Sequence, residues 1–129
     1  MNKIIIEVSI GELLDKISIL EIKQEKIKDP EKLKYINNEQ SILDDQFKKS
    51  VKSDDKLNNL FKSLKEINSK LWIIEDKKRQ CENDKDFGEK FVKLSRDVHF
   101  LNDDRAKIKL EINNYTGSTI KEIKEYTNY

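Results

Sequence analysis

The chain has 129 residues, of which 40% are charged, yet its net charge is only +1. This balance gives no overall positive field, so nucleic-acid binding is not expected, and the single cysteine, Cys81, excludes an intrachain disulfide and a cysteine-based zinc cluster. With only 3 glycines and 1 proline, the composition favours a single domain of a few long helices over a many-stranded sheet.

Residues 1–8 predict a short extended arm, because the stretch KIIIEV is β-branched and too short for a helix. Its three isoleucines need a partner surface. The stretch SIGE follows, and in it Ser9 and Glu12 have the spacing of a capping box, which predicts a helix over 9–28. Apolar residues cover so much of this helix that we expect it to be the most buried element.

The next two helices are separated by a polar break. Asp29 is the expected cap of a helix over 30–50, with Pro30 at its first turn, where the missing amide proton costs nothing. A further helix is predicted over 54–83, because apolar residues recur there every three or four positions. These spacings place an apolar stripe along each helix.

The last long helix is predicted over 87–116 and contains the stretch FLNDDRAKIKLEIN. Its apolar residues keep a heptad spacing, and Arg105 falls on one of those core positions. Gly117 ends the helix in the usual way. The tail, 117–129, is expected to add one more helical turn or to form a strap across the bundle.

Two long helices joined by a short break predict an antiparallel hairpin, and the first two helices predict another. Stacking the hairpins buries both stripes, so we expect an all-α, antiparallel up-down four-helix bundle with a short extended N-terminal segment. A heptad stripe left exposed would also allow a homodimer.

We expect no membrane span and a cytoplasmic location. The longest uncharged run has about nine residues, far short of the roughly 20 that a membrane helix needs. The sequence also shows no signal-peptide pattern at its start.

Arginine is rare in this chain, with three residues against twenty-three lysines. A rise of about 1.5 Å per residue puts Arg105 at a depth in the bundle close to that of Asp15 and Glu12 on the first helix. Two interpretations remain open. We favour a buried pair that sets the helix register, and the other is a clamp for a carboxylate or phosphate ligand.

The same measure of depth places Arg96 near Glu21 and Glu75, which predicts a second charged pair. Asp103 follows His99 by four residues on one helix, and such a pair could bind a metal ion or act as acid and base. The chain has no second histidine, so we favour a solvated surface histidine.

The acidic residues also allow an enzymatic alternative. All-α pyrophosphatases that act on nucleotides hold magnesium with paired acidic motifs. The residues that mimic this arrangement loosely are Glu21, Glu25, Glu75 and Asp76. The three-residue spacing of the second motif is missing, so we expect no metal site and no cofactor and assign no catalytic residue.

The stretch VSIGELLDKISILEIKQEKIKDPEKL, residues 8–33, resembles an uncharacterised family of small helical proteins found in bacteria and their phages. Residues 71–76, 86–113 and 117–126 agree with it in the same order. Members of that family look to be encoded beside, or fused to, glycosyltransferases and other polysaccharide genes. The resemblance implies an accessory role in glycan or envelope metabolism, or a phage-borne copy of such a gene, and transfers no catalytic residue.

We therefore expect a non-catalytic accessory or protein-interaction module whose partner is a second copy of the chain or a sugar-transfer enzyme. The alternative is a bundle that binds a small anionic molecule, or a metal-dependent enzyme such as a nucleotide pyrophosphatase. In either case the candidate site is a charged cluster: Glu12, Asp15, Glu21, Glu75, Arg96, Asp103 and Arg105.

Overall fold

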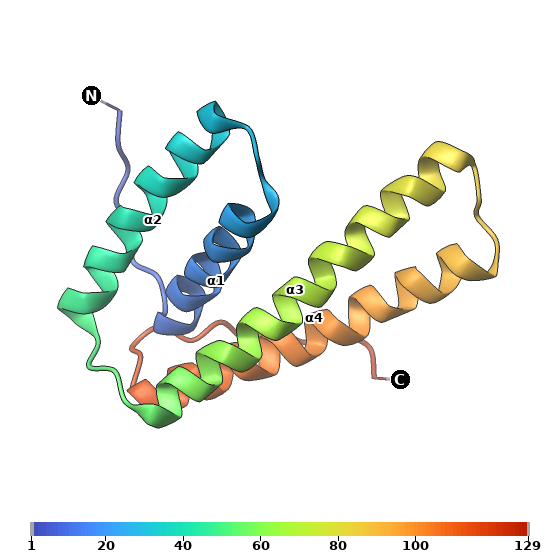
Figure 1. Ribbon diagram of the computed structural model, residues 1–129. Coiled ribbons are helices and arrows are strands. Elements are labelled where there is room, and N and C mark those ends of the chain that lie inside the picture. Colours follow the sequence, from blue (N-terminus) through green and yellow to red (C-terminus); the bar gives the residue numbers. More distant parts are fainter. Residues whose placement is uncertain (1, 129) are drawn as a thin grey trace.

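The computed structural model describes residues 2–128 and contains four helices, shown in Figure 1. They are α1 (Ile10–Lys26), α2 (Pro30–Ser50), α3 (Asp55–Asp84) and α4 (Glu89–Thr116). No strand occurs between residues 2 and 128. The predicted all-α class is confirmed.

Polar residues at the helix ends set the helix boundaries. Ser9, Asp29 and Asp54 cap α1, α2 and α3, and each side chain accepts a hydrogen bond of 2.8–3.0 Å from a backbone amide two or three residues further on. At the end of α4, Gly117 has a φ of 68°, in the left-handed region that favours glycine. The helices thus begin and end on local interactions.

The apolar core lies where α1 packs on the antiparallel hairpin of α3 and α4. Its buried side chains are Leu13, Leu14, Ile17, Leu57, Leu64 and Ile112. Helix α2 adds the partly buried Leu43 and Phe47 from its outer position, and its backbone lies close to that of α1 alone among the helices. Helix α1 is therefore the central element, because it alone contacts all three other helices.

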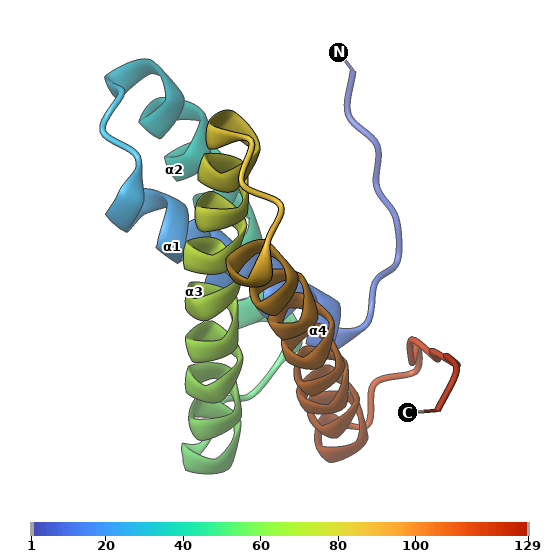
Figure 2. The same ribbon diagram turned by 90° about the vertical axis from the view of Figure 1, so that its right-hand side faces the viewer.

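Helix α1 crosses the α3/α4 hairpin obliquely, as Figure 2 shows. Its first half contacts α4, where the Gly11 amide donates to the Asn113 side chain at 2.7 Å. Its second half contacts α3, where Lys65 binds the carboxylates of Glu21 and Glu25 at 3.2 and 2.8 Å. The two hairpins of the bundle therefore cross each other instead of running in line.

This crossing leaves one end of the α3/α4 hairpin without a second layer of helices (Figure 1). We call residues 73–101 the distal hairpin. Within it only Cys81 is buried, and the remaining side chains are half-buried or exposed. The core of the protein therefore lies at the opposite end, under α1.

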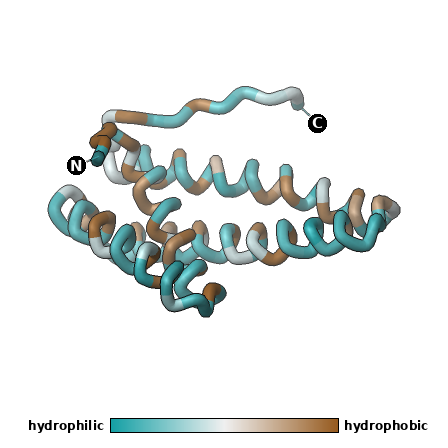
Figure 3. Tube along the Cα trace, turned by 90° about the horizontal axis from the view of Figure 1, so that it is seen from above, coloured by the Kyte–Doolittle hydropathy of each residue, from teal (hydrophilic) through white to brown (hydrophobic). Residues whose placement is uncertain are grey.

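Both ends of the described chain are extended. The arm, residues 2–8, precedes α1, and the tail, residues 118–128, turns back and runs beside α4 (Figure 3). The tail is thus a strap and not a further helical turn. Among residues 2–128, no helix combines the length and the apolar character that a membrane crossing requires.

Gly11 allows the close approach of α1 to α4. A Cβ atom at this position would lie 2.6 Å from the Lys109 carbonyl oxygen and 2.9 Å from the Asn113 side-chain oxygen. Gly11→Ala should therefore lower the free energy of unfolding by about 1–3 kcal/mol in a urea titration.

Gly88→Ala is the matched control, because a Cβ there meets only the Asp86 side chain at 3.5 Å. Its effect on the free energy of unfolding should stay below about 1 kcal/mol. Equal effects of the two substitutions would contradict the close packing of α1 on α4.

Candidate functional site

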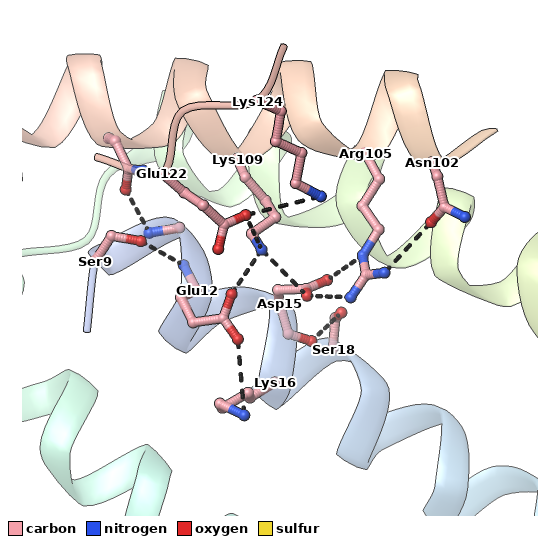
Figure 4. Close-up of polar contacts among 12 residues, drawn as sticks. Ser9, Glu12, Asp15, Lys16, Ser18, Asn102, Arg105, Lys109, Glu122 and Lys124 are labelled. Atoms are coloured by element: carbon pink, nitrogen blue, oxygen red, sulfur yellow. Dashed lines mark hydrogen bonds and ion pairs between the residues drawn. The ribbon is translucent and has the colours of Figure 1, made fainter. Parts of the chain in front are cut away.

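A layer of charged side chains lies between α1, α4 and the tail (Figure 4). We call Glu12, Asp15, Arg105 and Lys109 the charged layer. The side chains of Asp15 and Lys109 are only 2% and 8% exposed, whereas that of Arg105 is 29% exposed. Buried charges are tolerated only when they are paired, so the partners of each group decide what this layer does.

Asp15 is the centre of the layer. Arg105 donates to it from two nitrogens, with Nε 3.0 Å from Oδ1 and the second guanidinium bond reaching Oδ2. Asn68, on α3, donates to Oδ1 at 2.8 Å. Lys109 Nζ lies 3.7 Å from Oδ2. One carboxylate on α1 thus binds side chains from both α3 and α4.

These partners determine the ionisation of Asp15. Burial alone would raise its pKa, but the hydrogen bonds from Arg105 and Asn68 and the positive charges of Arg105 and Lys109 lower it further than burial raises it. The pKa of Asp15 is therefore below its ordinary value. The pKa of Arg105 is raised in turn, chiefly by its hydrogen bond to Asp15. The pair is charged at neutral pH.

Lys109 joins three segments of the chain. Its Nζ lies 2.6 Å from Glu12 on α1 and 3.4 Å from Glu122 in the tail. Burial would lower the pKa of Lys109, but the hydrogen bond to Glu12 and the neighbouring carboxylates raise it instead. Lys109 therefore ties α1 and the tail to α4 as a cation.

The first turn of α1 is held by the end of α4. Besides the Gly11 contact, the Ile10 amide donates to Ser118 Oγ at 3.2 Å, and Ser118 donates to the Ile120 carbonyl at 2.9 Å. Asn113 is 1% exposed. The backbone amides at the start of a helix have no partner within the helix. At the start of α1, the side chains of Asn113 and Ser118 accept hydrogen bonds from two of these amides.

The structure brings together only part of the predicted cluster. Arg105, Asp15 and Glu12 lie in the charged layer, but Glu21 pairs with Lys65, and no ion pair joins Arg96 to Glu21 within residues 2–128. The predicted pair is wrong because the crossing moves the second half of α1 away from α4. Arg96 instead lies over the ring of Phe100, at 5.8 Å.

The two other predicted site residues line separate surfaces. Glu75 lines an open groove of about 420 Å³ beside the charged layer, together with Trp72, Arg79 and Arg105. Asp103 lines a second groove, between α4 and the tail. Neither of them forms an ion pair with Arg105 or Lys109 among the described residues, but each groove borders the charged layer, the first through Arg105 and the second through Lys109.

Sequence reasoning missed Lys109, Asn68 and Glu122. Lys109 follows Arg105 by four residues and so lies on the same face of α4. This spacing is the one feature of the sequence that could have indicated Lys109 as a member of the charged layer. In a chain with twenty-three lysines this signal is weak. Nothing in the spacing of Asn68 or Glu122 marks them as partners of the layer.

The described residues contain no group of three or more histidine, cysteine or acidic side chains that could hold a metal ion. His99 packs edge-on against Phe100, with ring centroids 4.4 Å apart. The contacts that the charged layer makes are ion pairs and hydrogen bonds among groups of this chain.

A family model described as a family of unknown function (DUF6165) matches residues 4–129. The chain belongs to this family. No curated protein and no solved structure matches it. The family covers the charged layer, both hairpins and the tail, so these features belong to one continuous family domain.

Asp15→Asn tests whether the layer stabilises the fold. The substitution leaves Arg105 and Lys109 without their shared carboxylate, so the free energy of unfolding should fall by about 2–4 kcal/mol at pH 7. The folded pKa of Asp15 is below its unfolded value of about 3.9, so the stabilisation is present above that value and is lost as the pH falls below it through the folded pKa. The difference in free energy of unfolding between Asp15→Asn and the wild type, measured by urea unfolding, should therefore become smaller towards pH 3.

The matched control is Asp45→Asn, on the exposed face of α2. It should change the free energy of unfolding by less than about 0.5 kcal/mol at either pH. If the loss in free energy of unfolding caused by Asp15→Asn stays constant from pH 7 to pH 3, the ionised carboxylate is not the stabilising form.

Proposed function

We propose that this protein is a non-catalytic interaction module that binds another protein through its distal hairpin. The single observation that carries this proposal is the apolar surface left on the distal hairpin, whereas the members of the charged layer bind one another. An enzyme or a ligand clamp would instead need those charges directed into a pocket.

The pairing within the charged layer supports the non-catalytic role. Asp15, the deepest carboxylate, accepts hydrogen bonds from Arg105 and Asn68, and Lys109 binds Glu12 and Glu122. Such mutual neutralisation is what a structural layer requires.

The apolar surface is a stripe of exposed side chains along the distal hairpin. We call it the distal stripe and define it by Ile73, Phe87, Val92 and Phe100, which are 45%, 50%, 52% and 39% exposed. Two open grooves of about 550 and 370 Å³ follow it and meet at Asp97 and Phe100. Exposed apolar surface rimmed by polar residues is typical of protein interaction sites.

An amphipathic helix is the partner element that fits this surface. The grooves run along α4 and between α3 and α4, so a third helix laid there would complete the layer that α1 provides at the other end. Lys93, Arg96 and Asp97 flank the stripe with both signs of charge. A partner helix with an apolar face and mixed charges at its edges satisfies both features.

The partner we propose is a component of a sugar-transfer system in the cytoplasm. The resemblance to bacterial and phage proteins associated with glycosyltransferase genes supports this choice, and a phage-borne copy would act in the same way. Cys81 is a free, buried thiol, which suits a reducing compartment. The module would then recruit or position a partner enzyme.

Binding of a small anion is the weaker alternative. The groove beside the charged layer has an indole and two guanidinium groups in its wall, from Trp72, Arg79 and Arg105. However, Arg105 already donates two hydrogen bonds to Asp15. A ligand there would compete with a carboxylate held inside the protein, which favours the interaction module.

Substitutions in the distal stripe test the proposal. A partner is first identified by its co-purification with the wild-type chain and is then purified separately. Its affinity for the wild-type chain and for each variant is measured by calorimetry. Phe100→Asp and Ile73→Asp should each weaken this complex at least about tenfold, since exposed apolar anchors carry much of an interface's affinity. Their melting temperatures should stay close to that of the wild type.

Ile42→Asp is the control, because Ile42 is 58% exposed on α2, away from the distal hairpin. It should leave the affinity unchanged. A complex unaffected by both distal substitutions, or turnover of nucleotides or sugar nucleotides by the purified chain, would contradict the proposal.

A further inference from the structure

The arm before α1 is the most exposed apolar segment of the described chain. Ile4, Ile5 and Ile6 are 90%, 83% and 69% exposed. The backbone of residues 2–8 takes part in no hydrogen bond within residues 2–128. Figure 2 shows the arm extending away from the helices. Extended backbone with β-branched side chains and open hydrogen-bonding groups is suited to pairing with another strand.

The order of charges in the arm indicates which strand it pairs with. The segment reads Lys3, three isoleucines, Glu7, so a positive charge at one end mirrors a negative charge at the other. Antiparallel pairing of two such segments places each lysine opposite a glutamate. The segment is therefore complementary to itself in the antiparallel sense.

We propose that the arms of two copies of this chain pair as an antiparallel β-ribbon and so form a homodimer. Ile5 lies opposite Ile5 of the second copy, on the twofold axis. Lys3 of each copy then lies opposite Glu7 of the other, and Ile4 lies opposite Ile6.

Other registers lose these pairs. A shift that moves the twofold axis off Ile5 places Lys3 and Glu7 opposite uncharged residues, opposite a residue of the same charge, or beyond the end of the ribbon. Parallel pairing in register sets lysine beside lysine and glutamate beside glutamate. Since like charges opposite each other are unfavourable, the antiparallel register centred on Ile5 is favoured.

The ribbon has one charged and one apolar face. Successive side chains of a strand point to opposite faces, so Lys3, Ile5 and Glu7 share one face, and Ile4, Ile6 and Val8 share the other. A two-stranded ribbon alone is only marginally stable, so the apolar face needs a surface to pack on.

The tail provides apolar side chains close to the base of the arm. The Ile10 amide is bound to Ser118, which brings the start of the tail beside the start of α1. Beyond it, Ile120 and Ile123 are 37% and 78% exposed. In the proposed dimer the apolar face of the ribbon packs against these residues. The dimer then carries two distal hairpins. On the function proposed above, a partner with two binding elements is therefore bound more tightly.

Single cysteines test the register directly. Ile5→Cys places two thiols opposite each other on the twofold axis, within the Cα separation that a disulfide needs. Mild oxidation of the full chain should link Ile5→Cys into dimers at least roughly tenfold faster than Ile6→Cys. An equimolar mixture of Ile4→Cys and Ile6→Cys should link faster than either variant alone.

The wild type is the control for the cysteine experiment, because its one thiol, Cys81, is buried and should not link. Equal rates for Ile5→Cys and Ile6→Cys, or no linked dimer from either, would overturn the proposed pairing.

Exchange of the charges gives an independent test by sedimentation equilibrium. Lys3→Glu and Glu7→Lys should each raise the dimer dissociation constant roughly tenfold, because each turns two attractive pairs into repulsive ones. The double variant should regain the wild-type constant, and the two single variants mixed together should form a heterodimer.

Two further results would also overturn the inference. One is a wild-type chain that stays monomeric at its highest soluble concentration, as expected if the arm binds a sheet of another protein. The other is a dimer that both charge variants leave intact and that Phe100→Asp dissociates, which would place the contact on the distal stripe instead.

Discussion

The ion pair between Asp15 and Arg105 is the interaction on which the arrangement of the helices depends. It joins the first half of α1 to α4 inside the protein, where the Asp15 side chain is 2% exposed. A carboxylate at that depth is stable as an anion only with partners in place, and Arg105, Asn68 and Lys109 supply them. Displacing α1 along the hairpin would leave this charge unpaired, so the pair selects one position of α1 over its neighbours.

That position has consequences at both ends of the molecule. Because α1 crosses the α3/α4 hairpin, its second half contacts α3, where Glu21 binds Lys65. The distal hairpin is therefore left without a second layer of helices. At the other end, Lys109 and Ser118 bring the start of α1 and the tail together. The exposed distal stripe is thus a result of this packing geometry, and we propose that it and the exposed arm are surfaces for protein contacts.

Helical periodicity and the rise per residue were enough to predict the all-α class and to place Arg105 within reach of Asp15 or Glu12. They failed for Arg96 and Glu21, because a rise per residue measures depth correctly only when helix axes run in line. The crossing brings Gly11 into close contact with α4, and such a contact is set by side-chain volume in three dimensions, which helical periodicity does not describe. Lys109 was missed because lysine is the commonest cation of this chain, whereas the rarity of arginine made Arg105 conspicuous.

The interaction energy of Asp15 with Arg105 tests most directly whether this layer is structural. It is obtained from a double-mutant cycle of Asp15→Ala, Arg105→Ala and the double variant, with free energies of unfolding measured in urea at pH 7. A structural pair predicts a favourable coupling of about 1–3 kcal/mol and a loss of stability in both single variants. A coupling near zero, with Arg105→Ala as stable as the wild type, would contradict it and leave the guanidinium free for a ligand.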